Sequence, residues 1–209
     1  MAHTAREHLD LNLRTPPPPI LIRDPFLEFL GLVAPAEPVA VTFEDLVKAA
    51  GHLCPTVAGA YLLMRHGLLA LYGEQPAVRG DVRVTAYGGP TDFGYGPISQ
   101  LVNLVIGAAP ETGFGGLGPG RFRRRGLFVF RPDDLRHNEF ELERLDRGEA
   151  VHVTYEPTVV PAPKDLGAVM GPALTTGEAA AVERFRGLWL GRVAEILEAD
   201  ARAVKITRK

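Results

Sequence analysis

The chain contains only one cysteine, Cys54, among its 209 residues. A single cysteine excludes an internal disulfide framework. It also excludes a zinc ribbon, which is built from paired Cys-x-x-Cys knuckles. Any metal site in this chain must therefore draw most of its ligands from histidine, carboxylates or solvent.

A surplus of charge of one sign is also missing. The formal net charge is −2 at pH 7, so the whole molecule offers no positive field that would attract nucleic acid or an anionic lipid surface. No stretch reaches the ~18 apolar residues of a membrane span, and residues 1–14 lack the apolar core of a signal peptide. We therefore expect a cytoplasmic protein with neither a nucleic-acid partner nor a membrane partner.

The composition that remains is typical of a folded chain. Hydrophobic residues make up 46% and charged residues 23% of the sequence, close to the average of globular domains. Residues 1–23 are interpreted as an N-terminal arm, because Pro16-Pro17-Pro18-Pro19 cannot be helical and favours an extended polyproline geometry. Residues 24–209 are predicted to form a single domain.

Helix and strand signals follow one another in an order that predicts an α+β fold. Thr42 and Asp45 resemble a capping box at the start of one helix. The helix that follows Pro55 is apolar nearly all round, so it should be buried at the centre of the domain or at a subunit interface. Strands are predicted at 82–87, 127–131, 139–145 and 151–155. We expect an antiparallel sheet packed with this buried central helix, and a long C-terminal amphipathic helix capped by Thr175-x-x-Glu178.

The segment Gly51-His52-Leu53-Cys54-Pro55 is the strongest candidate for a functional site. Pro55 suits the first position of a helix, which places Cys54 at the N-cap. There the sulfur would face free backbone N–H groups and the positive end of the helix dipole, which favours the thiolate. An imidazole and a thiolate are a natural ligand pair for zinc and its first-row neighbours. A buried structural cysteine beside a surface histidine explains the same pattern about equally well.

His52 and Cys54 alone do not complete a zinc site, which needs at least one further protein ligand. His152 points away from the apolar residues of its predicted strand, so it faces either solvent or a site. The chain offers as completing ligands Tyr87, Asp92, Glu111, His137 and His152, and of these we name Asp92 and His152 as the possible further metal ligands.

A glycine-rich stretch at residues 112–120 formally contains Gly113-x-Gly115-x-x-Gly118. The dinucleotide-binding fingerprint joins a strand to a helix, whereas a predicted strand comes next here, so that interpretation is rejected. The stretch is either a surface turn with solvated arginines or a loop that closes over an anionic ligand. The candidate cofactor-binding residues in it are Gly113, Phe114, Gly116 and Arg121.

Residues 43–61, with the Gly51-His52-Leu53-Cys54-Pro55 motif, resemble the Gly-His-x-Cys-Pro segment of the formylmethanofuran dehydrogenase E-subunit family. The loop at 112–116, the strand at Leu127 and the closing helix with Trp189 follow in the expected order, so the resemblance covers roughly residues 24–200. It implies an α+β core, a homodimer, and a cleft near the dimer interface in which His52 and Cys54 hold a metal.

The chain departs from that family at two kinds of position. Some members carry further cysteines where this sequence has Gly88-Gly89 and Gly107-Ala108, and some carry a C-terminal zinc ribbon that is missing here. The resemblance is therefore closest to a free-standing branch without the ribbon.

Three functions remain as hypotheses. The first is a metal-binding cytoplasmic homodimer with a cleft around His52 and Cys54, holding a divalent metal, zinc before others, and serving as a small-molecule enzyme or an accessory to metal-cofactor metabolism. The second omits the metal and makes Cys54 a thiolate nucleophile with His52 as its base. The third is a non-catalytic module in which the glycine-rich loop and its arginines bind an anion.

Overall fold

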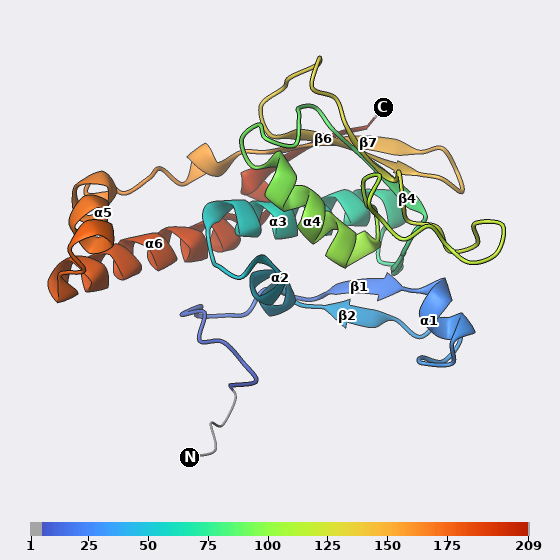
Figure 1. Ribbon diagram of the computed structural model, residues 1–209, viewed down its shortest axis with the longest axis horizontal. Coiled ribbons are helices and arrows are strands. Elements are labelled where there is room, and N and C mark those ends of the chain that lie inside the picture. Colours follow the sequence, from blue (N-terminus) through green and yellow to red (C-terminus); the bar gives the residue numbers. More distant parts are fainter. Residues whose placement is uncertain (1–5, 209) are drawn as a thin grey trace.

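In the computed structural model, which describes residues 6–208, the helix α3 (Pro55–Tyr72) lies in the middle of the molecule (Figure 1). Most of its residues are buried, including Tyr61, Leu63 and Met64. Together with α4 (Tyr95–Ile106), it forms a helical layer between a larger and a smaller sheet. The prediction of a buried central helix is confirmed, since a helix that is apolar all round needs cover on more than one side.

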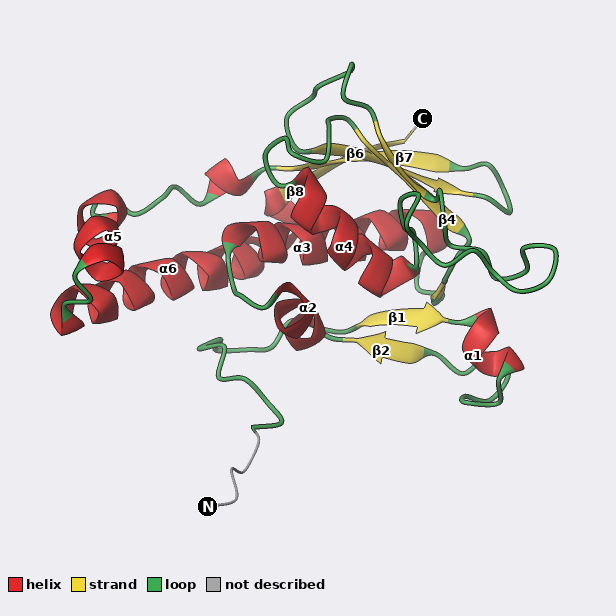
Figure 2. Ribbon diagram, in the orientation of Figure 1, coloured by secondary structure: helices red, strands yellow, loops and turns green. Residues whose placement is uncertain are grey.

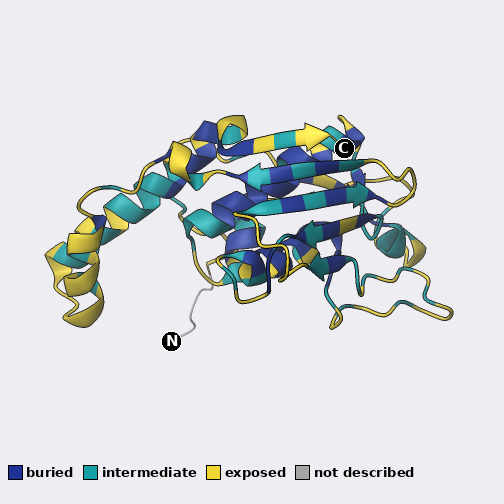
Figure 3. Cartoon of the chain, turned by 90° about the horizontal axis from the view of Figure 1, so that it is seen from above, coloured by how far each residue is buried: buried dark blue, intermediate teal, exposed yellow. Residues whose placement is uncertain are grey.

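The larger sheet has five strands in the order β5-β4-β6-β7-β8. Buried and less buried residues alternate along these strands (Figure 3). The buried side chains of Leu142 and Val153 pack against Gly67 of α3. Neighbouring strands are antiparallel as predicted, except that the edge strand β5 runs parallel to β4. The strands are β4 (Val82–Ala86), β5 (Phe128–Phe130), β6 (Glu139–Arg144), β7 (Ala150–Tyr155) and β8 (Val204–Arg208).

The smaller sheet lies on the other side of the helical layer. Its strands are β1 (Ile20–Arg23), β2 (Val39–Val41) and β3 (Ala77–Val78), in the order β2-β1-β3. The predicted arm includes residues 20–23, but in β1 these residues pair with both neighbouring strands, and Ile22 is fully buried. The first five residues of the predicted arm, and Lys209, lie outside the described residues.

Two short helices begin at residues whose side chains cap them. Asp24 is the N-cap of α1 (Pro25–Phe29), and its carboxylate accepts from the backbone of Phe26 and Leu27. Thr42 and Asp45 form the predicted capping box of α2 (Phe43–Ala50). Both starts depend on hydrogen bonds between residues two or three apart, which is why the local sequence is sufficient to predict them.

The C-terminal region contains more helix than predicted. A helical hairpin of α5 (Leu166–Thr175) and α6 (Ala179–Ala199) extends away from the body (Figure 2). The predicted Thr175-x-x-Glu178 capping box is wrong, because Thr175 is the last residue of α5 and its hydroxyl donates to Gly171 O at 2.9 Å. α6 is the expected long C-terminal helix, and it buries Val193 and Ile196 in its second half. Two short 3-10 helices, η1 (Pro157–Val159) and η2 (Asp200–Ala203), precede α5 and follow α6 respectively.

The α+β class is confirmed, with a largely antiparallel sheet, a buried central helix and a long C-terminal helix. None of the helices within residues 6–208 combines the length and the apolar content needed to cross a membrane.

Candidate functional site

The turn that carries His52 and Cys54 connects α2 to α3, and its residue types explain its shape. Gly51 ends α2 in the left-handed region, at φ 70°, where a residue with a Cβ would be strained. Pro55 occupies the first position of α3, and Cys54 is its N-cap with extended backbone angles, φ −151° and ψ 168°. The predicted placement of Cys54 at a helix start is therefore confirmed.

Cys54 and His52 form a close pair. The Cys54 Sγ lies 3.3 Å from the His52 Nε2, and the His52 Nδ1 lies 2.9 Å from the Ala50 carbonyl oxygen. A carbonyl oxygen only accepts, so Nδ1 carries the hydrogen, and the lone pair of a neutral imidazole is at Nε2 beside the sulfur. The Cys54 side chain accepts no capping hydrogen bond from α3. The predicted contact of the sulfur with the free N–H groups of α3 is therefore wrong, and the sulfur contacts the His52 imidazole instead.

A pocket of about 530 Å³ opens in front of this pair. Gln100 and Asn103, on α4, supply amide groups to its wall, and Leu101 and Leu104 supply apolar surface. Phe93 stands at the pocket with 65% of its surface exposed and a left-handed backbone, φ 44°. Its other lining residues are Ala49, Ala50, His52, Cys54, Thr56, Val57, Gly94 and Pro97.

Two aromatic side chains from distant parts of the chain hold the turn in place. The Trp189 Nε1 donates to the Leu53 carbonyl at 2.6 Å, and the Tyr155 hydroxyl donates to the Pro55 carbonyl at 2.8 Å. Burial raises the pKa of Tyr155, so its hydroxyl keeps its hydrogen as a donor throughout the physiological range. The tyrosine ring lies directly against Gly59, where a Cβ would approach it to 2.4 Å.

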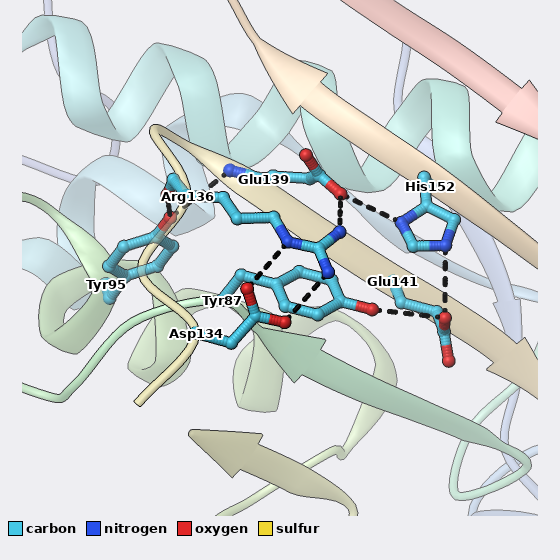
Figure 4. A network of polar contacts seen from close by, with 7 residues as sticks. All are labelled: Tyr87, Tyr95, Asp134, Arg136, Glu139, Glu141 and His152. Atoms are coloured by element: carbon cyan, nitrogen blue, oxygen red, sulfur yellow. Dashed lines mark hydrogen bonds and ion pairs between the residues drawn. The ribbon is translucent and has the colours of Figure 1, made fainter. Parts of the chain in front are cut away.

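His152 does not join the pocket. It lies on the face of the larger sheet opposite α3, where its Nδ1 is 3.0 Å from Glu139 Oε1 and its Nε2 is 3.2 Å from Glu141 Oε2 (Figure 4). The ring of Tyr87 stacks on the imidazole, and the Tyr87 hydroxyl donates to Glu141 at 3.3 Å. His152 therefore lies on the outer face of the sheet, as one of the two alternatives expected, and there it belongs to a network of polar contacts.

The remaining candidate ligands are also placed elsewhere. The Asp92 Oδ2 accepts from Gly89 N at 2.7 Å within its own loop, and Glu111 is exposed. His137 contacts the Phe93 ring edge to face, with centroids 5.1 Å apart, so it reaches the pocket only through that ring. Within residues 6–208, no three His, Cys, Asp or Glu side chains are arranged to hold a metal ion. His52 and Cys54 therefore stand as two potential ligands.

The glycine-rich loop lies beside α1, away from this pocket (Figure 1). The Phe114 ring stacks on Phe26 at 5.5 Å, and the Arg121 guanidinium lies 4.6 Å above the Phe122 ring. Gly116 has φ 91°, and a Cβ there would approach the Arg121 carbonyl to 2.6 Å. The candidates Phe114 and Arg121 thus form an aromatic cluster, and Gly113 and Gly116 allow the tight path of the loop.

Several residues of the pocket were not predicted as functional. Gln100 and Asn103 lie three residues apart on an otherwise apolar helix, so they share a face, and that pattern was the available signal. Trp189 was expected on the closing helix, and nothing local indicates that its N–H reaches the Leu53 carbonyl.

Comparisons with known proteins return a distant likeness of fold. No protein-family model matches the sequence, and no curated protein matches it. A similar solved structure is that of a protein from Syntrophus aciditrophicus that is like FmdE, the E subunit of a tungsten formylmethanofuran dehydrogenase. The two chains share 13% sequence identity over 81% of this chain and 72% of that chain, with a TM-score of 0.44.

Proposed function

We propose that this protein binds a divalent metal ion of the zinc class through His52 Nε2 and Cys54 Sγ. The observation that carries the proposal is their 3.3 Å separation. Bonds of about 2.1 Å to nitrogen and about 2.3 Å to sulfur, at the tetrahedral angle, put two such ligand atoms about 3.6 Å apart. The pair is therefore within about 0.3 Å of the spacing that zinc requires.

The surroundings of His52 support the same role. Histidines that bind metals commonly donate their second ring N–H to a carbonyl or carboxylate, which orients the ring. The Ala50 carbonyl accepts from the His52 Nδ1 at 2.9 Å and serves this purpose. Pro55 fixes the backbone angle φ just after Cys54, so less conformational freedom is lost there when an ion binds.

Two protein ligands are one fewer than the three of a catalytic zinc site, so water or a bound ligand would have to fill the remaining coordination positions of the ion. The adjoining pocket of about 530 Å³ lies in the size range of small-molecule sites. Its amides from Gln100 and Asn103 could orient a polar ligand while Leu101 and Leu104 cover its apolar part. A bound ion would act as a Lewis acid on such a ligand. These features suit a small-molecule enzyme or a metal-cofactor accessory protein, and we infer that it acts in the cytoplasm as a homodimer.

Metal content tests the proposal directly. Tag-free protein is purified, and zinc, cobalt and nickel are measured by plasma emission after equilibration with each ion. We expect about one equivalent per chain, falling below about half in His52→Ala and in Cys54→Ala, with His8→Ala unchanged as a histidine control outside the pocket. Cobalt-loaded protein should also show a thiolate-to-cobalt absorption band that disappears in Cys54→Ala. A wild-type protein that binds less than about half an equivalent would overturn the proposal.

One observation favours a second candidate function. A separation of 3.3 Å between Sγ and Nε2 also suits a hydrogen bond from a thiol to a neutral imidazole, in which His52 acts as base and Cys54 as nucleophile. Iodoacetamide labelling separates the two functions. Zinc should block the labelling of Cys54 until a chelator is added, whereas a metal-free nucleophile would be labelled equally with and without zinc and more slowly in His52→Ala.

A further inference from the structure

A second pocket, of about 520 Å³, lies beside α1 and the loop after residue 119. It is bordered by the start of α1, by the turn between β3 and β4, and by residues 120–127. None of its lining residues belongs to the pocket of His52 and Cys54. A ligand of this second pocket would therefore bind independently of the proposed metal site.

One wall of this second pocket is built around the buried carboxylate of Asp24, which is 1% exposed. Arg124 Nη2 donates to both of its oxygens at 3.0 Å, and Arg79 Nη1 donates to one at 3.3 Å. Burial alone would raise the pKa of Asp24, but the hydrogen bonds and the charge of Arg124 lower it below its ordinary value. One carboxylate thus faces two guanidinium groups, and positive charge remains in excess.

Two further arginines of the wall have no carboxylate partner among residues 6–208. The Arg123 Nε donates to the Arg125 carbonyl at 2.9 Å, and the Arg125 Nε donates to the Gly113 carbonyl at 3.1 Å. These bonds hold both side chains to the backbone. The Arg123 Nη2 lies next to Gly126, which lines the pocket, whereas the Arg125 guanidinium lies beside Gly113 and Gly115, which do not. Such planar forks match the oxygens of phosphate and carboxylate.

The opposite side of this second pocket is less positive. Arg83 is paired with Glu143 at 3.0 Å. Asp81 accepts from the Tyr72 hydroxyl at 3.3 Å, and burial raises the pKa of Asp81, which disfavours its charged form. The pocket as a whole therefore contains more guanidinium groups than carboxylates, and an anion would restore the balance.

Apolar surface lies next to these charges. The rings of Phe26 and Phe122 stack at 4.8 Å and both line the pocket, together with Leu127. We propose that this pocket binds a small phosphate ester whose phosphate pairs with Arg123 and whose apolar part covers Phe26 and Phe122. Arg121, predicted from the sequence to bind a cofactor, lies over Phe29 and Phe122 and is not part of the pocket.

Calorimetric titration of the full chain tests this site with phenyl phosphate, inorganic phosphate and benzoate as probes. Phenyl phosphate should bind most tightly. Inorganic phosphate should bind more weakly because it has no aromatic ring, and benzoate because it carries one negative charge instead of two. Arg123→Gln should weaken phenyl phosphate about tenfold, which is the effect of one charged hydrogen bond. Arg121→Gln removes the same charge two residues away and should change affinity less than about twofold.

Three results would overturn the proposal: no binding of phenyl phosphate to the wild type, equal losses in Arg123→Gln and Arg121→Gln, or loss of binding in His52→Ala. The last result would place the ligand in the other pocket. Arg124 is left unaltered because its removal would leave the buried Asp24 without its main partner. Arg123 is exposed, so Arg123→Gln should keep its melting temperature, and circular dichroism checks this.

Discussion

The indole Nε1 of Trp189 donates a hydrogen bond to the carbonyl oxygen of Leu53 at 2.6 Å. Leu53 stands between His52 and Cys54, so the C-terminal helix α6 is attached directly to the residues of the candidate site. The proposed metal pocket therefore depends on a contact between two distant parts of the chain.

Replacing Trp189 by phenylalanine should keep a smaller aromatic ring and lose this hydrogen bond. We expect a loss of about 1 kcal/mol in the free energy of unfolding. Cobalt affinity should fall as well, because His52 and Cys54 become less well fixed. Urea denaturation followed by circular dichroism measures the first effect, and cobalt titration measures the second. Phe185→Leu alters the ring stacked on Trp189 at 5.5 Å without touching the Leu53 carbonyl, so equal loss of cobalt affinity in that variant would contradict the explanation.

Gly59→Ala should destabilise the protein by about 1–3 kcal/mol, as overpacked core variants do. The added methyl group would approach the Tyr155 ring to 2.4 Å, and moving that ring would break the bond of its hydroxyl to the Pro55 carbonyl. Gly191→Ala is the matched control in α6, since nothing lies within 4 Å of its Cβ position. That variant should be neutral or more stable by up to about 1 kcal/mol. The free energies of unfolding of the two variants, from urea denaturation, should differ by at least about 1 kcal/mol, and equal values would contradict the prediction.

The N-terminal arm should be held to α2 by the ionised carboxylate of Glu44. It lies 2.8 Å from Lys48 Nζ, accepts from the Leu9 N–H at 2.9 Å and lies 3.2 Å from His8 Nδ1. The hydrogen bond from Lys48, followed by that from Leu9, lowers the pKa of Glu44 from 4.5 to about 2. Because the folded pKa is the lower one, this stabilisation is present above pH 4.5 and is lost as the pH falls toward 2.

Two measurements check the attachment of the arm. A carboxyl-detected NMR titration should show Glu44 changing protonation near pH 2. At neutral pH, Glu44→Gln should speed tryptic cleavage after Arg14, because an amide cannot replace the charge. Glu111→Gln removes an exposed carboxylate far from the arm in sequence and should leave the cleavage rate unchanged. Equal rates in the wild type and Glu44→Gln would refute the prediction.

The helix α5 should be the contact through which two copies of the chain associate. It has no charged side chain, yet Leu174 is 72% and Met170 is 40% exposed, and apolar surface of this kind commonly marks an interface. Leu174→Glu should convert a dimer into a monomer in size-exclusion chromatography with light scattering. Leu32→Glu, at a leucine that is 67% exposed beside α1, should remain dimeric. A monomeric wild type would disprove the expected homodimer.

Much of the candidate site could be predicted because its geometry is local. Gly51 in a left-handed conformation, Cys54 at an N-cap and Pro55 at the first helical position each follow from the backbone preferences of a few adjacent residues. The same is true of the Thr42 and Asp45 capping box. The predicted capping box at Thr175 failed, because the same residue pattern lies at the end of a helix that was not predicted, α5.

Residues distant in the sequence meet in ways that no local pattern indicates. His152 lies on a polar face, as its strand alternation predicts, but its Glu139 and Glu141 partners depend on the register of β6 with β7. The strand β8 was not predicted, although Val204 and Ile206 alternate with polar residues, and its place in the sheet is set by pairing with β7. In the glycine-rich region, Arg123 and Arg125 line the second pocket, whereas Arg121 lies over the Phe29 and Phe122 rings outside it.

The sequence by itself determined the His52 and Cys54 pair and the turn that brings them together, because those contacts span two residues and obey local backbone rules. Only the tertiary structure decided what surrounds them. The pocket wall from α4, the Trp189 bond to Leu53 and the placement of His152 on the far face of the sheet all arise from long-range packing, in which burial of apolar faces selects the neighbours.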